Sequence, residues 1–375
     1  MILLDFAYAQ QDAYLKTLED LVDFESPTFH RAASNALANH LQGVLRSDGW
    51  QVKRLTQSEV GDQLIASWQA PGDTSTLILA HYDTVWPLGT LKDMPFRRNG
   101  DKVYGPGVCD MKAGITNSIH ALRLVHTHAL TLKGPVTLLL TSDEEAGSHH
   151  SRDVIEDLAK EHQRVLVVEP SRDDGAIKVG RKGVGEFRLY FKGKSAHAGN
   201  NPKDGASALR ELAHFLFFAE ELNDDVTTTS VNVTVAQAGT VSNVIAEEAS
   251  VRVDVRVPTR SETERVTNAI YGYTPRDERV SVSVTGGVNR PPLEPTDQNR
   301  SLYQEAKAVL DRWGLDFGSA VVGGGSDGNF TSALGIPTLD GIGAAGGGPH
   351  ARFEHIRLRE TLERLALLTA LITES

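Results

Sequence analysis

VTLLLTSDEEAGS, residues 136–148, decides the fold class of this chain. Its first six residues lack the alternation of apolar and polar side chains that marks a strand with one solvated face, so they predict a strand buried on both faces. The runs VLVV at 165–168 and TLILA at 76–80 have the same character. Such strands are typical of a parallel sheet covered by helices, and we predict an α/β domain of α/β/α architecture with a mostly parallel central sheet.

Apolar residues at a helical period predict the helices that cover this sheet. The helices are expected at 11–25, 36–45, 112–126, 302–313 and 358–372. Two further strands are expected at 50–56 and 63–68. These elements lie on either side of a central region with a different pattern.

That central region, from about residue 183 to 285, alternates apolar and polar residues, most clearly in VRVDVRVP at 251–258. The expected order is strand, helix, strand, strand, helix, strand, which predicts a ferredoxin-like α+β (βαββαβ) domain inserted into the first domain. The boundaries are expected at 1–181 and 290–375 for the first domain and at 182–289 for the insert.

Composition limits the partners of the protein. The chain has 375 residues, 49 acidic against 38 basic, a formal net charge of −11, and a single cysteine at Cys109. An acidic surface repels nucleic-acid phosphates and anionic lipid, so we expect neither nucleic-acid nor membrane partners. The N-terminal MILLDFAYAQ has no basic leader, and Asp5 interrupts its apolar run. We therefore expect a cytoplasmic protein.

Polar side chains follow the apolar strands at the point where each strand ends. They are His81 and Asp83 after TLILA, Glu144 and Glu145 after VTLLLT, and Glu169 after VLVV. A less regular segment, VYGPGVC, runs into Asp110 in the same way. Ligands of an open α/β sheet bind at the carboxyl ends of its strands, so these clusters are expected to meet.

Each of these residues has an ordinary explanation when taken singly. His81 suits a turn, Asp110 suits a helix N-cap, and the acidic pair 144–145 suits the first turn of a helix. Together they are different, because carboxylates gathered at one sheet edge repel one another unless cations neutralise them. Three carboxylates with His81 and His350 supply the donors of a two-ion zinc site.

Seven motifs in register resemble the M20 co-catalytic zinc peptidases, and within them the glutamate carboxypeptidase-like branch. They are HYDTV at 81–85, GPGVCDMKAG at 105–114, TSDEEAGS at 141–148, VVEPS at 167–171, SAHAG at 195–199, GGGSDGN at 323–329 and GGGPHARFEHI at 346–356. They occur in the order of the family and cover most of the chain. The resemblance implies an enzyme, a metallopeptidase or amidohydrolase.

The resemblance implies ligands for two divalent metal ions. His81 and Glu169 would bind one ion, Glu145 and His350 the other, and Asp110 would bridge both. Zinc is the expected metal, with cobalt and manganese as alternatives.

The resemblance also implies three residues that act beside the metal ligands. Glu144 would be the general base that takes a proton from the attacking water and returns it to the leaving amine. Asp83 would hydrogen-bond the ligating imidazole of His81 and fix its tautomer. His197, in the insert, would steady the oxyanion, usually at the active site of a partner subunit. A homodimer through the inserted lid domain is therefore expected.

The same resemblance implies candidates for substrate binding. Asn243 and Arg256 match family positions, and a bidentate arginine suits a substrate carboxylate. Arg290 resembles a basic residue that some glutamate-releasing members place near the substrate side chain, and Ser326 is a further candidate. The presence of glutamate rather than aspartate at position 169 resembles the pattern of carboxypeptidases and deacylases more than that of aminopeptidases.

The expected reaction is hydrolysis of the amide bond of an N-acyl or peptidyl amino acid with a free C-terminal carboxylate, with glutamate as the first expectation for the residue released. One alternative is an N-acyl-amino-acid deacylase of the acetylornithine or succinyl-diaminopimelate type, or a broad dipeptidase. Another, from a different class, is a non-catalytic metal-dependent binding or assembly protein.

Two other patterns compete with the metal hypothesis. GGSDG at 324–328 matches the GxSxG nucleophile elbow of serine hydrolases, and Asp340 with His350 or His355 follows in the matching chain order. That hypothesis leaves the strand-end carboxylates without a role. GPG at 105–107 suggests a dinucleotide loop, but the third glycine of GxGxxG is missing.

Overall fold

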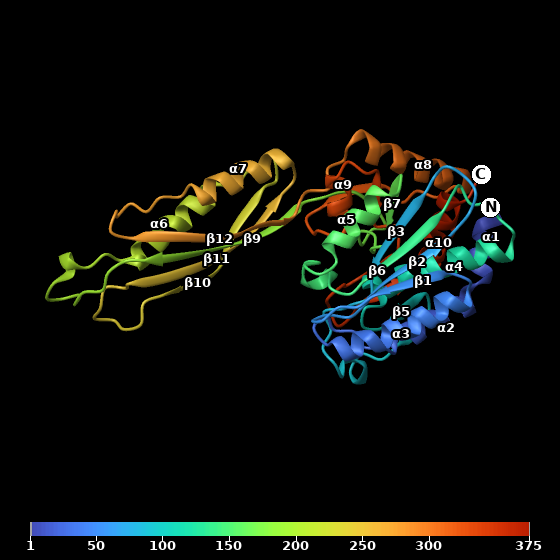
Figure 1. Ribbon diagram of the computed structural model, residues 1–375, viewed down its shortest axis with the longest axis horizontal. Coiled ribbons are helices and arrows are strands. Elements are labelled where there is room, and N and C mark those ends of the chain that lie inside the picture. The colour runs from blue at the N-terminus through green and yellow to red at the C-terminus, as the bar shows by residue number, and fades with distance from the viewer. Residues whose placement is uncertain (1, 375) are drawn as a thin grey trace. The chain divides into compact units, whose positions relative to one another are not determined.

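The computed structural model describes residues 2–374 and divides into two compact units (Figure 1). The first unit runs to Gly180 and resumes over Pro295–Val322 and from Ser326 onward, and the second comprises Arg181–Glu294 with Gly323–Gly325. The predicted insert, 182–289, lies within the range of the second unit. No helix among residues 2–374 is long and apolar enough to cross a membrane.

The first unit is built on an eight-stranded sheet with the order β1-β2-β6-β3-β7-β14-β8-β13. Its strands are β1 (Gln51–Leu55), β2 (Gln63–Trp68), β3 (Thr76–His81), β6 (Val136–Thr141), β7 (Arg164–Val167), β8 (Ile177–Arg181), β13 (Ser319–Val322) and β14 (Thr338–Asp340). The central strands β6, β3, β7 and β14 pair in parallel, whereas β1, β2 and β8 pair antiparallel with their neighbours. The predicted α/β class is confirmed, with parallel pairing at the centre of the sheet.

Successive residues of the central strands face two different hydrophobic cores. Ile78 and Ala80 of β3 pack in the larger core, and Leu77 and Leu79 pack in a smaller one with Phe330. The helices that supply these cores are α1 (Ile2–Ala9), α2 (Gln11–Val22), α3 (Arg31–Ser47), α4 (Ala113–Thr127), α5 (Arg152–Lys160), α8 (Asp297–Trp313), α9 (Gly328–Ala333) and α10 (Leu358–Ile372). Burial on both faces is the reason that these strands show no polar alternation.

A small sheet, ordered β15-β16-β5-β4, joins two segments that are far apart in the sequence. Its strands are β4 (Arg97–Asn99), β5 (Lys102–Tyr104), β15 (Gly346–Gly347) and β16 (His355–Arg357). Tyr104 pairs with His355, so the loop after β5 lies beside the loop between β15 and β16. Strands of two or three residues have no recognisable period, and the sequence did not predict them.

The second unit has one four-stranded antiparallel sheet, ordered β10-β11-β9-β12, with its hydrophobic core under two helices. In chain order its elements are β9 (Gly183–Lys192), α6 (Ala208–Glu221), β10 (Ser230–Ala238), β11 (Glu248–Val257), α7 (Arg260–Tyr271) and β12 (Ser281–Arg290). The hydroxyls of Ser207 and Thr259 accept backbone N–H bonds at the starts of α6 and α7, which satisfies donors that the helices leave open. This order of elements and strands is the ferredoxin-like arrangement.

Candidate metal centre

Three central strands of the first unit end side by side. Parallel pairing sets His81, the last residue of β3, opposite Thr141, the last residue of β6, and β7 ends two residues before Glu169. The carboxyl ends of parallel strands share one edge of a sheet, so the loops that follow them meet there. The polar clusters that the sequence places after these strands therefore converge.

One group of potential metal ligands contains His81, Asp110 and Glu169, whose ligand atoms lie within 4.8 Å of one another. The Nε2 atom of His81 is 3.1 Å from Oδ1 of Asp110 and 3.5 Å from Oε1 of Glu169. His81 is 1% exposed and Glu169 is 7% exposed. Two carboxylates and one imidazole in a buried position are a donor set that zinc accepts.

A second group contains Asp110, Glu145 and His350, again with ligand atoms within 4.8 Å. The Nε2 atom of His350 is 3.2 Å from Oε2 of Glu145 and 3.5 Å from Oδ2 of Asp110. Asp110 thus contributes Oδ1 to the first group and Oδ2 to the second. His350 has a φ of 63°, a backbone region that residues other than glycine rarely adopt and that is common at functional sites.

A buried oxygen provides a test of whether a cation fits this centre. Among residues 2–374, the Oε1 atom of Glu145 is one of few buried side-chain oxygens without a hydrogen-bond partner. A buried carboxylate oxygen without a partner is costly unless a cation neutralises it. The unsatisfied oxygen and the mixed imidazole and carboxylate donors both fit a divalent ion.

The pKa values in the centre show how strongly these groups interact. Burial raises the pKa of Glu145 to about 7, against the hydrogen bond from His350. Hydrogen bonds to Asp110 and Glu145 raise the pKa of His350 to about 10. Burial lowers the pKa of His81, but hydrogen bonds to Asp110 and neighbouring carboxylates outweigh it and raise that pKa well above its usual value. Without a cation, the two imidazoles thus hold protons that balance the carboxylates.

Asp83 connects the two strand-end loops. The Nδ1 atom of His81 lies 3.1 Å from the Asp83 carbonyl oxygen and 3.4 Å from its Oδ1. The same carboxylate accepts the backbone N–H groups of Glu144 and Glu145 at 3.2 and 3.3 Å, and the Thr28 hydroxyl at 2.7 Å. The wholly buried Asp83 therefore holds both the imidazole and the acidic loop.

Glu144 lies beside the first group without belonging to it. Its Oε2 atom is 4.0 Å from Nε2 of His81, and its side chain is 12% exposed. Its backbone N–H is fixed on Asp83. A carboxylate in this position can reach a water molecule next to the ligand atoms.

In the second unit, the predicted residues His197 and Asn243 lie on adjacent segments. His197 bridges Val244, and the N–H of Ala198 donates to the Asn243 carbonyl at 2.9 Å. The Nδ1 atom of the exposed His197 accepts the N–H groups of Gly199 and Asn200 at 3.1 and 3.0 Å. A neutral ring that accepts at Nδ1 carries its proton on Nε2, so His197 presents a hydrogen-bond donor.

Arg256 and Arg290 lie at the opposite end of the second-unit sheet. Each pairs with Val184 of β9, one from β11 and the other from β12. Asp254 binds Nε and Nη2 of Arg256 at 2.9 Å each, and Arg290 is 5% exposed. His197 follows the far end of β9, a strand of ten residues that spans roughly 33 Å. The structure thus separates the two arginines from His197 and Asn243.

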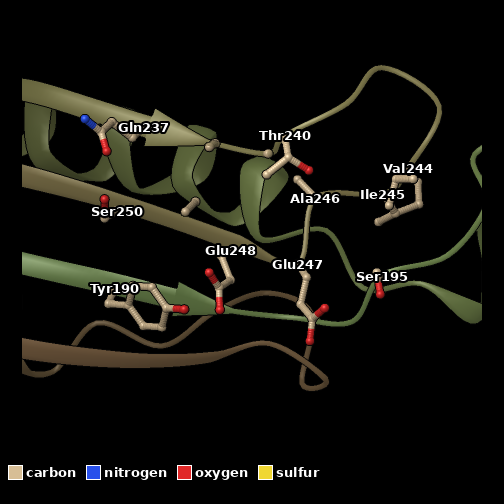
Figure 2. A pocket seen from close by; sticks show the side chains of 13 residues that line it. Tyr190, Ser195, Gln237, Thr240, Val244, Ile245, Ala246, Glu247, Glu248 and Ser250 are labelled. Carbon is tan, nitrogen blue, oxygen red and sulfur yellow. The ribbon is translucent and has the colours of Figure 1, made fainter.

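A groove of about 420 Å³ lies at the same end of the second unit as His197 (Figure 2). Ser195, Val244 and Ile245 line it together with the strand residues Tyr190 and Glu248. Figure 2 shows that the lining side chains come from the strand ends and from the loop that carries Val244. The metal-ligand groups, in contrast, belong to the first unit.

The profile described as "Peptidase family M20/M25/M40" matches residues 77–374. The chain belongs to this family. Carboxypeptidase G2 from Pseudomonas sp. (strain RS-16) is 31% identical over 100% of this chain and 92% of that protein. A succinyl-diaminopimelate desuccinylase from Leptothrix cholodnii is 30% identical over 91% of this chain and 93% of that protein. The expected resemblance to the M20 peptidases is confirmed, and the protein is a hydrolase of that family.

Solved structures of M20 relatives share the fold of this chain. Aminopeptidase PepT from Bacillus cereus has a TM-score of 0.82 at 21% identity and covers 96% of this chain and 98% of that one. The M20 family metallo-carboxypeptidase Sso-CP2 from Sulfolobus solfataricus has a TM-score of 0.70 at 17% identity, with 96% and 98% covered. At these identities the likeness concerns the fold alone.

The serine-hydrolase hypothesis does not fit this M20 chain. Ser326 is wholly buried, and its hydroxyl donates to Oδ2 of Asp340 at 2.5 Å. A catalytic triad needs a histidine between serine and aspartate, but His350 lies against Asp110. The hydroxyl oxygen of Ser326 also accepts the N–H of Gly328 at 3.1 Å.

Two residues that hold the M20 centre in place were not predicted from the sequence. Thr28 donates its hydroxyl to Asp83, and Glu354 accepts the N–H groups of Gly107, Cys109 and Asp110. The bond from Gly107 also contradicts the dinucleotide-loop hypothesis, because a carboxylate already accepts from the amide that a phosphate would need. The one available signal was a charged residue, Glu354, inside the last of the seven motifs.

Proposed function

We propose that this M20 hydrolase is a di-metal carboxypeptidase, which cleaves the amide bond of an N-acyl or peptidyl amino acid with a free C-terminal carboxylate. The observation that carries the proposal is the pair of ligand groups that share Asp110. His81 and Glu169 would hold one ion, Glu145 and His350 the other, and Asp110 would bridge them. Zinc is the first candidate, since imidazole and carboxylate are among its common ligands.

Bound divalent ions would polarise the scissile carbonyl and lower the pKa of a water molecule. Glu144 then takes one proton from that water as its oxygen attacks the carbonyl carbon. The same carboxyl group returns the proton to the amine nitrogen as the C–N bond breaks. Asp83 supports this step by holding the backbone of Glu144 and the ring of His81 in fixed positions.

The arginines of the second unit are candidates for carboxylate recognition. Arg256 is the candidate for the substrate α-carboxylate, because Asp254 fixes the plane of its guanidinium through two bonds. Arg290 is the candidate for a second, side-chain carboxylate. Glutamate is therefore the first candidate for the released residue.

His197 and Asn243 are proposed to complete the site of a partner subunit. Their end of β9 lies roughly 33 Å from the arginine end of the same sheet, so one chain cannot easily present all four to one substrate. A homodimer through the second unit resolves this separation. The Nε2 proton of His197 would then stabilise the oxyanion of the tetrahedral intermediate.

A second candidate is an N-acyl-amino-acid deacylase, which the desuccinylase relative at 30% identity favours. Both candidates use the same metal chemistry and differ in which side of the amide bond is recognised. A panel of N-acyl glutamates, N-succinyl amines and dipeptides, assayed for amine release, separates them. Preferential release of C-terminal glutamate supports the carboxypeptidase. Release from N-succinyl substrates whatever the amine would contradict it in favour of the deacylase.

A further inference from the structure

Four hydrogen-bond donors converge on the carboxylate of Glu354. Its Oε1 atom accepts the backbone N–H groups of Cys109 and Asp110 at 2.9 and 3.1 Å. Its Oε2 atom accepts the N–H of Gly107 and the indole N–H of Trp86, each at 2.9 Å. Glu354 is wholly buried, so these bonds stand in for the water that a carboxylate otherwise requires.

The bonds of Glu354 cross between two segments of the chain that are far apart in the sequence. Glu354 is four residues after His350, and its own N–H closes a turn on the Ala351 carbonyl at 2.8 Å. Its acceptor oxygens bind the loop that ends in Asp110. One side chain thus ties the loop of one candidate ligand to the loop of another.

The pairing of β5 with β16 brings these loops together but leaves their spacing open. Tyr104 pairs with His355, and beyond this pair one segment continues to Asp110 while the other leads back to His350. Within that span, Glu354 provides three bonds to the backbone of residues 107–110. The Asp110 and His350 side chains, which these two loops carry, lie 3.5 Å apart between Oδ2 and Nε2.

We propose that Glu354 is a positioning residue that sets the geometry of the ligand group Asp110, Glu145 and His350. This inference rests on the proposed di-metal function. Residues outside the coordination sphere that orient ligands commonly change metal affinity about 10- to 100-fold when replaced. Glu354 acts here through backbone N–H groups rather than through the ligand side chain.

Glu354→Gln tests the proposal with little change of size. A glutamine offers one acceptor oxygen, while its NH₂ group faces donors and cannot accept from them. We expect the folded variant to bind one of its two ions about 10- to 100-fold less tightly, measured by chelator competition. The visible spectrum of the Co²⁺-loaded variant should also differ from that of the wild type. Wild-type affinity for both ions would overturn the positioning role.

Glu354→Asp separates position from charge and also serves if Glu354→Gln does not fold. Aspartate keeps the negative charge but is one methylene shorter, so it cannot reach all the donors. The proposal predicts that the aspartate variant also loses affinity for an ion. Full recovery of both affinities with aspartate would show that only the charge matters and would overturn the proposal.

Glu211 provides a matched control in the second unit. This glutamate is 1% exposed and accepts the backbone N–H groups of Arg276 and Asp277, as Glu354 accepts those of its loop. Glu211→Gln should bind both ions as the wild type does. Loss of ion affinity in this control as well would overturn the assignment to Glu354. Wild-type protein that binds no ion would refute the proposed function itself, which is a different outcome.

Discussion

Glu144 and Glu145 are sequence neighbours with different surroundings. Glu145 places Oε2 3.2 Å from His350 and leaves Oε1 buried without a partner, whereas Glu144 stays partly accessible beside His81. We expect Glu144→Gln to lower kcat by about 100-fold or more while both ions stay bound, because the variant cannot accept the proton. Glu145→Gln should instead lose an ion. Steady-state kinetics with metal analysis checks both variants. A near-normal kcat in Glu144→Gln would contradict the assignment of Glu144 as the general base.

Metal binding should be strongly pH-dependent. The pKa of His350 is about 10 in the metal-free protein, and that of His81 is also raised. Both imidazoles are protonated below these pKa values and must lose a proton to bind an ion, so affinity should rise with pH. Each proton released on binding makes the metal affinity rise about tenfold per pH unit. Competition titrations at pH 6, 7 and 8 measure the slope, and an affinity that stays constant over this range would contradict the prediction.

The residues of the candidate site could be predicted from the sequence better than the residues that hold them in place. Asp110 and the strand-end residues carry charged side chains in recognisable motifs, and the structure places the potential ligand atoms of each group within 4.8 Å of one another. Thr28 acts through one hydrogen bond and Glu354 through four, all with residues far away in the sequence. No periodicity or spacing in one sequence encodes such a contact.

At the scale of the elements, His120 makes the packing of α2 against α4 sensitive to acid. Its Nε2 atom bonds the Thr17 hydroxyl at 3.0 Å, and burial, with the charge of Arg123, lowers its pKa to about 3. In the unfolded chain His120 takes up a proton with a pKa of about 6.5, whereas in the folded chain it stays neutral down to about pH 3. The unfolded state therefore gains stability from protonation between these pH values, and the free energy of unfolding falls as the pH drops from about 6.5 toward 3.

We expect His120 to make the free energy of unfolding about 2 kcal/mol lower at pH 5 than at pH 8. Replacing it by glutamine, which can still bond Thr17, should remove this part of the pH dependence. Urea unfolding of both proteins at the two pH values gives the difference. Identical pH dependence in His120→Gln and the wild type would show that His120 does not carry it.

Long elements were predictable and short ones were not. The run 136–141 is β6 to the residue, because six buried residues leave a clear pattern. The small sheet of β15, β16, β5 and β4 was missed, since its strands are two or three residues long. The helix α1 was also missed, because its eight residues are mostly apolar and show no distinct helical face.

At the scale of the whole molecule, the proposed role of His197 in a partner's site gives a complementation test. A heterodimer of His197→Ala and Glu144→Ala chains would contain one site with both groups intact and one with neither. Co-expression with random pairing should therefore restore about one quarter of wild-type activity from two inactive parents. Activity no higher than that of the parents would place His197 in the site of its own chain.

The two-part organisation was predictable because the two sheets are solvated differently. The second-unit strands alternate, as VRVDVRVP shows, since the core lies on one face only. Which residue of one subunit meets which site cannot be derived from strand patterns. In the proposed dimer, that information resides in loops such as 195–199.

We propose that two bound divalent ions are required for hydrolysis by this M20 chain. The most direct measurement is a zinc titration of the chelated enzyme, with amino-acid release from an N-acyl glutamate followed at each step. We expect no turnover after chelation, and activity that rises with added zinc and levels off at two ions per chain. Full activity in the chelated enzyme, or a plateau with no ion bound, would contradict it.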